Sequence, residues 1–146
     1  MLLSFKGKGD KTIVDFKLSE DTISLKEGRT PIKFKISFIN KTQNSLDFPK
    51  ELGSGYEDDL GNDYYLSITK IDANRVSGEI FNQVCYPNVV NPGPFIIIKP
   101  LERYRKSDAT NLYQIKYPGV YAIQFVFAND LAFLGKSNKD TLVIQP

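Results

Sequence analysis

The chain contains neither histidine nor tryptophan, and these two absences exclude several kinds of functional site. Without histidine, the sequence excludes Ser-His-Asp and Cys-His catalysis and every metal site that uses imidazole. Without tryptophan, the largest stacking platform for sugars or bases is missing, although the eight tyrosines could partly replace it. We therefore expect a protein that is not an enzyme, with no catalytic residues and no cofactor.

Cysteine is also scarce, because Cys85 is the only one in 146 residues. A single cysteine excludes an internal disulfide framework. The chain also has no histidine that could deprotonate the thiol of Cys85. We therefore interpret Cys85 as a small, partly buried residue at a strand end rather than as a nucleophile.

Long apolar runs and strong net charge are absent as well. The apolar runs are far too short to cross a bilayer, so we expect no transmembrane segment. The net charge of +2 gives no strong attraction to nucleic acid, and no nucleic-acid partner is expected. Residues 1–5 do not have the pattern of a secretory signal, which leaves two interpretations: a cytoplasmic protein, or an exported one whose signal is missing from this sequence. We favour export, to the periplasm, the surface or the medium.

The composition is that of one globular domain. Hydrophobic residues make up 41% and charged residues 25%, which is ordinary for a folded protein and excludes disorder. The length allows one domain with a real core, so we expect a single domain over 1–146, with 1–11 as a flexible tail.

Period-two alternation dominates the chain and predicts strands. The clearest example is 32–38, where the even positions are apolar and the odd positions are polar. The segments predicted as strands are 14–18, 23–25, 32–38, 46–49, 64–71, 76–84, 95–98, 101–106, 120–127 and 140–144. No stretch has a helical period over three turns, although 131–134 could form one turn. The pattern predicts an all-β, antiparallel sandwich of about seven to nine strands.

One short motif resembles a known family. Immunoglobulin-like domains often place a tyrosine at the start of the sixth strand, with a glycine or alanine two residues earlier, and its hydroxyl bonds the backbone upstream. The segment Gly119-Val120-Tyr121 is similar, with Ile123 where antibody domains carry a cysteine. Tyr117 stands where the family has an acidic residue, and the buried tryptophan is missing. The resemblance implies a divergent bacterial immunoglobulin-like domain and carries over no functional residue.

Two loops are the candidates for recognition, 50–63 and 85–94. The second contains three prolines, which hold it rigid and lower the entropy lost on binding, and its aromatic neighbours could anchor a ligand. A crossover between the two sheets explains the same prolines and is the favoured interpretation. If the domain binds a ligand, the expected contacts are Tyr56, Tyr86, Pro87, Asn88, Asn91 and Phe95.

The acidic stretch 57–63 contains the oxygen ligands for a Ca²⁺ site formed by Asp58, Asp59 and Asp63. Its order does not match the EF-hand, and a solvated turn is the favoured interpretation, so no metal is expected. The same carboxylates could combine with Glu51, Glu79 or Glu102 as a glycosidase pair, but almost any protein of this size has enough acids for that.

Two further motifs have simple structural explanations. The basic run 103–106 could contact phosphate or an acidic polymer, but the near-neutral total favours a charged edge strand that resists aggregation. Asn40-Lys41-Thr42 matches the glycosylation acceptor pattern, which often occurs by chance.

The leading hypothesis is a non-enzymatic binding module, exported or surface-attached in a bacterium, whose end loops recognise a protein or glycan. A proteinase inhibitor or protease-associated domain is the alternative. A carboxylate-dependent hydrolase is the third hypothesis.

Overall fold

The computed structural model describes residues 12–25, 31–50, 63–72, 75–84, 94–112 and 115–146. The predicted tail 1–11 lies outside them. The elements are β1 (Val14–Leu18), β2 (Thr22–Ser24), β3 (Pro31–Ile39), β4 (Leu46–Pro49), β5 (Tyr64–Asp72), β6 (Arg75–Val84), β7 (Phe95–Ile98), β8 (Arg103–Asn111), β9 (Gly119–Phe127), the 3-10 helix η2 (Asn129–Leu134) and β10 (Lys136–Gln145). The all-β prediction is confirmed. The described residues form ten strands, and β2, β4 and β7 are only three or four residues long.

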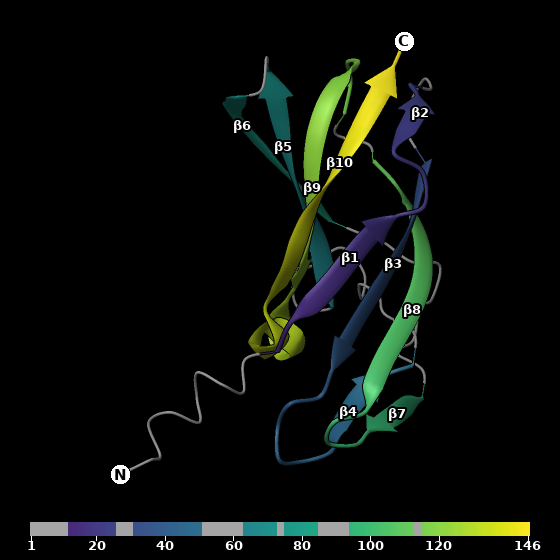
Figure 1. Cartoon of the computed structure of the whole chain (residues 1–146), viewed down its shortest axis with the longest axis vertical. Coiled ribbons are helices and arrows are strands. Elements are labelled where there is room, and N and C mark those ends of the chain that lie inside the picture. The colour runs from purple at the N-terminus through teal and green to yellow at the C-terminus, as the bar shows by residue number, and fades with distance from the viewer. Residues whose placement is uncertain (1–11, 26–30, 51–62, 73–74, 85–93, 113–114) are drawn as a thin grey trace.

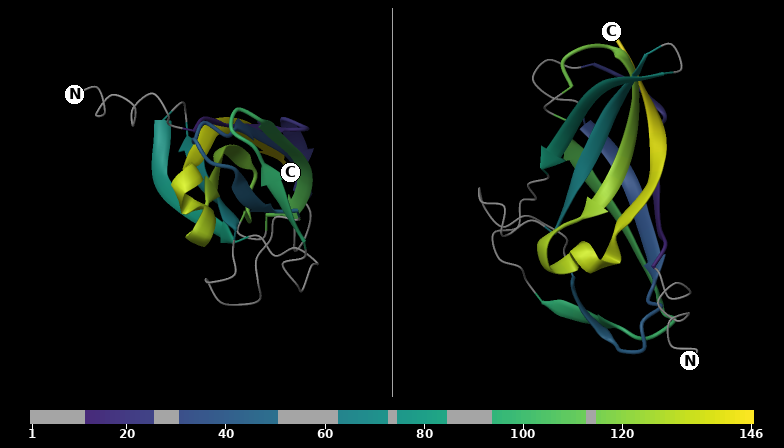
Figure 2. Two further views of the ribbon diagram at one scale, coloured as in Figure 1. Left: turned by 90° about the horizontal axis from the view of Figure 1, so that it is seen from below. Right: turned by 90° about the vertical axis from the view of Figure 1, so that its left-hand side faces the viewer.

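The strands form two layers, joined along one edge (Figures 1 and 2). One layer has the order β6-β5-β9-β10 and the other the order β8-β3-β1, while β4 and β7 form a separate two-stranded sheet. β10 is paired in parallel with both β1 and β2. All other strand pairs of the described residues are antiparallel, as the sequence predicted.

Alternating side chains build the core between the layers. In β3 the predicted apolar face is the buried one, and Phe34 and Phe38 are 1% and 0% exposed. Aromatic rings run through this core, with Tyr64 stacked on Phe125 at a centroid distance of 4.4 Å. Burial of each such side chain contributes about 1.5–3 kcal/mol, so phenylalanine and tyrosine supply the bulk that tryptophan provides in related architectures.

Two side chains of β10 hold the seam between the layers where the backbones diverge. The Asn138 amide accepts a hydrogen bond from the Phe16 backbone N–H at 2.9 Å and donates one to the Phe16 carbonyl at 3.0 Å. The Asp140 carboxylate accepts one from the Leu18 N–H at 2.8 Å. These side chains take the place of a neighbouring backbone, so the Phe16 N–H, the Phe16 carbonyl and the Leu18 N–H all have hydrogen-bond partners.

Two strands differ from their predicted bounds by four residues or more, and the others by one or two at most. β8 continues to Asn111, five residues past the expected end, because it pairs with β3 as far as Pro31. β10 begins at Lys136 rather than at residue 140. Both added segments are polar and do not alternate with apolar residues, so only pairing with a neighbour makes them strands.

The tyrosine motif forms the corner that its spacing predicted. The Tyr121 hydroxyl donates a hydrogen bond to the Tyr117 carbonyl at 2.7 Å, and the Tyr121 ring is 3% exposed. This bond ties the start of β9 to the turn that precedes it.

Replacing Tyr121 with phenylalanine should lower the free energy of unfolding by about 1–2 kcal/mol, because the Tyr117 carbonyl loses its partner while the ring stays in place. Urea unfolding measures the difference. Tyr117→Phe is the matched control, since the Tyr117 side chain is 71% exposed and only its backbone carbonyl takes part. Equal effects of the two substitutions would contradict a role for the corner.

Candidate functional site: a loop end and an outer groove

The two candidate recognition loops attach to the molecule side by side. Pro49 and Phe95 are cross-strand partners, and the Lys50 N–H donates a hydrogen bond to the Pro94 carbonyl at 2.9 Å. At their other attachments, Tyr65 is paired with Val84. Both loops therefore connect the same two places, the β4–β7 sheet and the base of the β5–β6 hairpin.

Most of the predicted contacts lie within the loops themselves. Tyr56, Tyr86, Pro87, Asn88 and Asn91 lie outside the described residues, and so do Asp58, Asp59, Glu51 and Cys85. Phe95 is described. It begins β7 and is 58% exposed.

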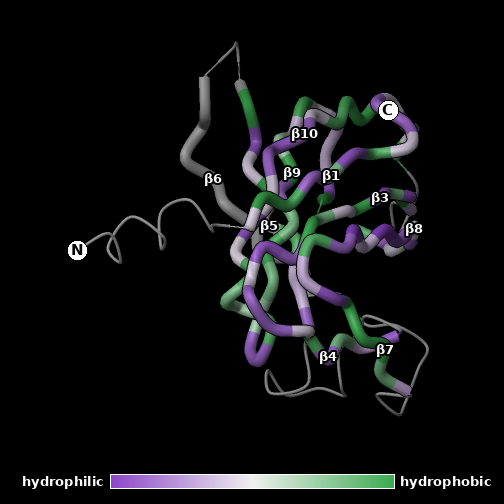
Figure 3. The backbone as a smooth tube through the Cα atoms, turned by 60° about the horizontal axis from the view of Figure 1, so that its bottom comes forward, coloured by the Kyte–Doolittle hydropathy of each residue, from purple (hydrophilic) through white to green (hydrophobic). Residues whose placement is uncertain are grey.

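The β4–β7 sheet forms a platform with one face in the core and one in solvent. We call this platform, with Lys50 and Pro94, the loop end. On the inner face Phe48 is 1% exposed, and its ring centroid lies 4.6 Å from that of Tyr104 and 5.5 Å from that of Phe38. On the outer face Ile97 is 61% exposed. Figure 3 shows β7 as an apolar segment at this end of the molecule. Exposed apolar side chains on a firmly packed base are typical of a contact surface.

Asn40 connects the loop end to the rest of the sandwich. Its side chain is fully buried, and its amide nitrogen donates hydrogen bonds to the carbonyls of Asn44 and Ile98, both at 2.9 Å. Its amide oxygen accepts from the Thr42 N–H at 3.0 Å and from the Thr42 hydroxyl at 2.6 Å. Both amide hydrogens are thus engaged in the interior, so the match of Asn40-Lys41-Thr42 to the glycosylation pattern is a chance one.

The remaining acidic candidates have structural roles where they are described. Glu102 accepts a hydrogen bond from the Lys99 N–H at 3.0 Å and closes the turn between β7 and β8. Asp63 is half-buried immediately before β5, and its carbonyl accepts from the Ala128 N–H at 2.9 Å. Glu79 lies on β6. Within the described parts of the chain, no three His, Cys, Asp or Glu residues are grouped as metal ligands would be.

A second concave surface, which we call the outer groove, lies on the solvent face of β1, β3 and β8 and reaches β10. Its volume is ≈ 610 Å³. Polar side chains from these four strands line it: Asp15, Lys17, Lys35, Ser37, Arg105, Ser107, Asn138 and Asp140. The sequence shows cations at alternate positions in 33–35 and 103–105, but only the pairing of β3 with β8 places them next to each other.

Comparisons with known proteins identify no family. No family model matches the chain, and no curated protein matches it. Among solved structures, the sporulation control protein Spo0M of Bacillus subtilis aligns with 93% of this chain and 50% of its own, at 8% identity and a TM-score of 0.45. A structural-genomics target aligns over 94% and 88%, at 13% identity and a TM-score of 0.42. A CARDB domain from Pyrococcus furiosus, in complex with di-metal ions, aligns over 92% of each chain at 8% identity and a TM-score of 0.40.

The chain spans half of the Spo0M chain. At these identities and TM-scores, none of the three structures supports an inference about activity. In the part of the chain that the structure describes, no helix has the length and apolar character that crossing a bilayer requires.

Proposed function

We propose that the chain is a non-enzymatic binding module of the immunoglobulin-like class, exported or surface-attached in a bacterium, which recognises a protein or glycan through its loop end. The observation that carries this proposal is the common attachment of the two candidate loops on a platform where Phe95 and Ile97 are 58% and 61% exposed.

The strand order supports the immunoglobulin-like assignment. Lettered in that family's way, β1, β3 and β8 correspond to A, B and E in one layer, and β10, β9, β5 and β6 correspond to G, F, C and C′ in the other. The Tyr121–Tyr117 hydrogen bond lies at the start of the F strand, where the tyrosine corner of that family belongs.

Rigid support of the loops favours recognition by the loop end. Phe48 and Ile98 are 1% and 2% exposed and fasten both strands of the platform to the core. Loops whose ends are fixed in this way lose less entropy on binding than loops with mobile ends.

The carboxylates of the outer groove also favour a role in binding over hydrolysis. Asp140 accepts hydrogen bonds from the Leu18 N–H and the Thr141 N–H at 2.8 and 2.9 Å, so one oxygen holds β1 and the other binds the next residue of β10. A glycosidase pair needs two carboxyl groups directed at one bond, and Asp140 already uses both its oxygens for backbone contacts.

A pair of matched substitutions tests the loop end. Wild type, Phe95→Asp and Phe133→Asp are applied to a glycan array and to an array of bacterial envelope proteins. Phe133 is the control, because it is a phenylalanine of similar exposure, 61%, that lies on η2 and is not part of the β4–β7 platform. We expect Phe95→Asp to lose about tenfold or more in affinity for the targets bound by wild type, as loss of an aromatic anchor does, and Phe133→Asp to keep it. Full binding by Phe95→Asp would contradict recognition at the loop end.

A further inference from the structure

We propose that the outer groove is a second binding site, separate from the loop end, and that it binds a linear acidic polysaccharide. Its cations are Lys17, Lys35 and Arg105, and the other polar side chains that line it are Asp15, Ser37, Ser107, Asn138 and Asp140.

The register of three strands assembles these charges. Lys17 on β1 is opposite Lys35 on β3, which is opposite Ser107 on β8. In the adjacent row Asp15 is opposite Ser37, which is opposite Arg105. Neighbouring strands lie about 4.8 Å apart, and alternate residues along a strand lie about 6.7 Å apart. The three cations Lys17, Lys35 and Arg105 therefore form a compact group.

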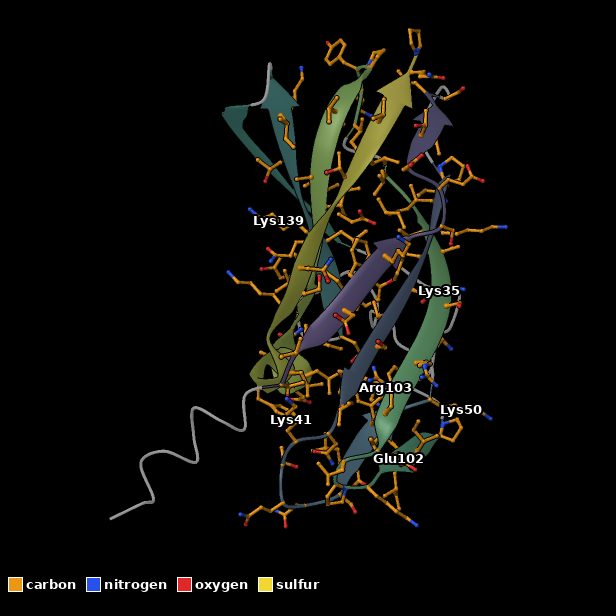
Figure 4. All side chains as sticks on the ribbon, in the orientation of Figure 1. Lys35, Lys41, Lys50, Glu102, Arg103 and Lys139 are labelled. Carbon is orange, nitrogen blue, oxygen red and sulfur yellow. The ribbon has the colours of Figure 1, made fainter. Side chains whose placement is uncertain are left out.

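The basic surface extends beyond the groove along the same strands. Lys33 and Arg103 are exposed on the same face as Lys35 and Arg105. Figure 4 shows Lys35 and Arg103 beside the β3–β8 pair, with Lys139 on the opposite side of the view. A chain with several anionic groups could therefore contact more than one row of cations.

The Lys17–Lys35 pair indicates an anionic ligand. Like charges directly opposite each other on a sheet face destabilise the pairing of the strands. Across the described ranges, neither lysine forms an ion pair with a carboxylate, although Asp15 lies on the same face. A ligand that supplies negative charge here would relieve this repulsion.

The uncharged and acidic residues select the class of ligand. No aromatic side chain is among the groove's solvent-facing residues, so a single-stranded nucleic acid would find no base-stacking platform. The apolar, aromatic centre of a typical protein interface is also missing. Ser37, Ser107 and Asp15 offer acceptors for the hydroxyl groups of a sugar. A polymer with both hydroxyl and carboxylate or sulfate groups fits this mixture.

The test measures binding of the whole chain to heparin and to polygalacturonate, with dextran as the neutral polysaccharide. We expect both acidic polymers to bind and dextran not to bind. Affinity should fall by about tenfold or more between low and moderate salt, because the contacts are between exposed charges. Lys35→Glu and Arg105→Glu should each weaken binding about tenfold, and Lys139→Glu, the same change on β10, should alter it less than about twofold.

Lys35→Glu also controls for folding. It replaces a like-charge pair with an attractive Lys17–Glu pair, so its urea midpoint should equal or exceed that of wild type, and loss of binding cannot then come from unfolding. If it did unfold, Lys35→Gln removes the same charge with less change and should weaken binding in the same direction.

Three results would overturn the proposal: no binding to either acidic polymer, an equal loss with Lys139→Glu, or tighter binding to polyglutamate, oligo(dT) or anionic vesicles. The last would assign the groove to an acidic protein, a nucleic acid or a membrane. Phe95→Asp should bind the acidic polymers as wild type does, so failure of the loop-end proposal and failure of this one are distinguishable.

Discussion

Replacing Asn40 with alanine should lower the free energy of unfolding by about 3 kcal/mol. The side chain is fully buried, and its four hydrogen bonds join the end of β3 to β7 and to the turn that follows Asn40. Each buried partner left unsatisfied costs about 1–3 kcal/mol, and the Ile98 carbonyl is the most deeply buried of them. Urea unfolding, followed by circular dichroism, gives the difference.

Asn44→Ala is the matched control for this substitution. The Asn44 side chain is exposed, and only its backbone carbonyl accepts from Asn40, so its replacement should change stability by less than about 0.5 kcal/mol. Asn40→Asp keeps the acceptor for Thr42 but removes the two N–H donors and buries a charge, and we expect it to be at least as destabilising as alanine. A loss below about 1 kcal/mol for Asn40→Ala would show that water replaces the amide.

Replacing Phe48 with alanine should cost about 3–5 kcal/mol, because it leaves a cavity between rings that pack closely on all sides. The centroid of Phe48 lies 4.6 Å from that of Tyr104, 5.5 Å from that of Phe38 and 6.2 Å from that of Phe127. Thermal and urea unfolding both measure this loss.

Phe95→Ala provides the comparison on the paired strand. Phe95 is 58% exposed, so its truncation should change stability by less than about 1 kcal/mol. Phe48→Ala should also weaken binding at the loop end while the fold persists, since the platform loses its anchor to the core. If Phe48→Ala and Phe95→Ala had equal effects on stability, the packing of the platform against the core would not determine its position.

The separation of the two proposed sites has a structural basis. The loop end is fastened by apolar burial and by Asn40, and its exposed residues include the apolar side chains of Phe95 and Ile97. The outer groove is charged and hydrophilic and lies on the outer face of a three-stranded layer. One surface is thus suited to a partner held by aromatic anchors, and the other to a partner held by exposed charge that salt would displace.

The sequence by itself determined the strands and the corner. Alternation in 32–38 identified the buried face of β3, because successive side chains of a strand point to opposite faces and only one face is buried. The spacing of Gly119 and Tyr121 predicted a hydrogen bond that the structure contains, since the motif is local and needs only a few residues. The recognition loops could be proposed from their prolines, but five of the six predicted contacts lie outside the described residues.

Only the tertiary structure decided which strands are neighbours, and the candidate sites depend on that. The parallel pairing of β1 and β2 with β10 joins residues more than one hundred positions apart, and no local pattern reports such a contact. Asn40 resembled a glycosylation site in the sequence and is a buried connector in the fold. The lysines of β1 and β3 resembled ordinary solvated positions until the register placed Lys17 opposite Lys35. Side-chain period is a local property of the chain, whereas register and layer order come from long-range packing and hydrogen bonding, so the first could be predicted and the second could not.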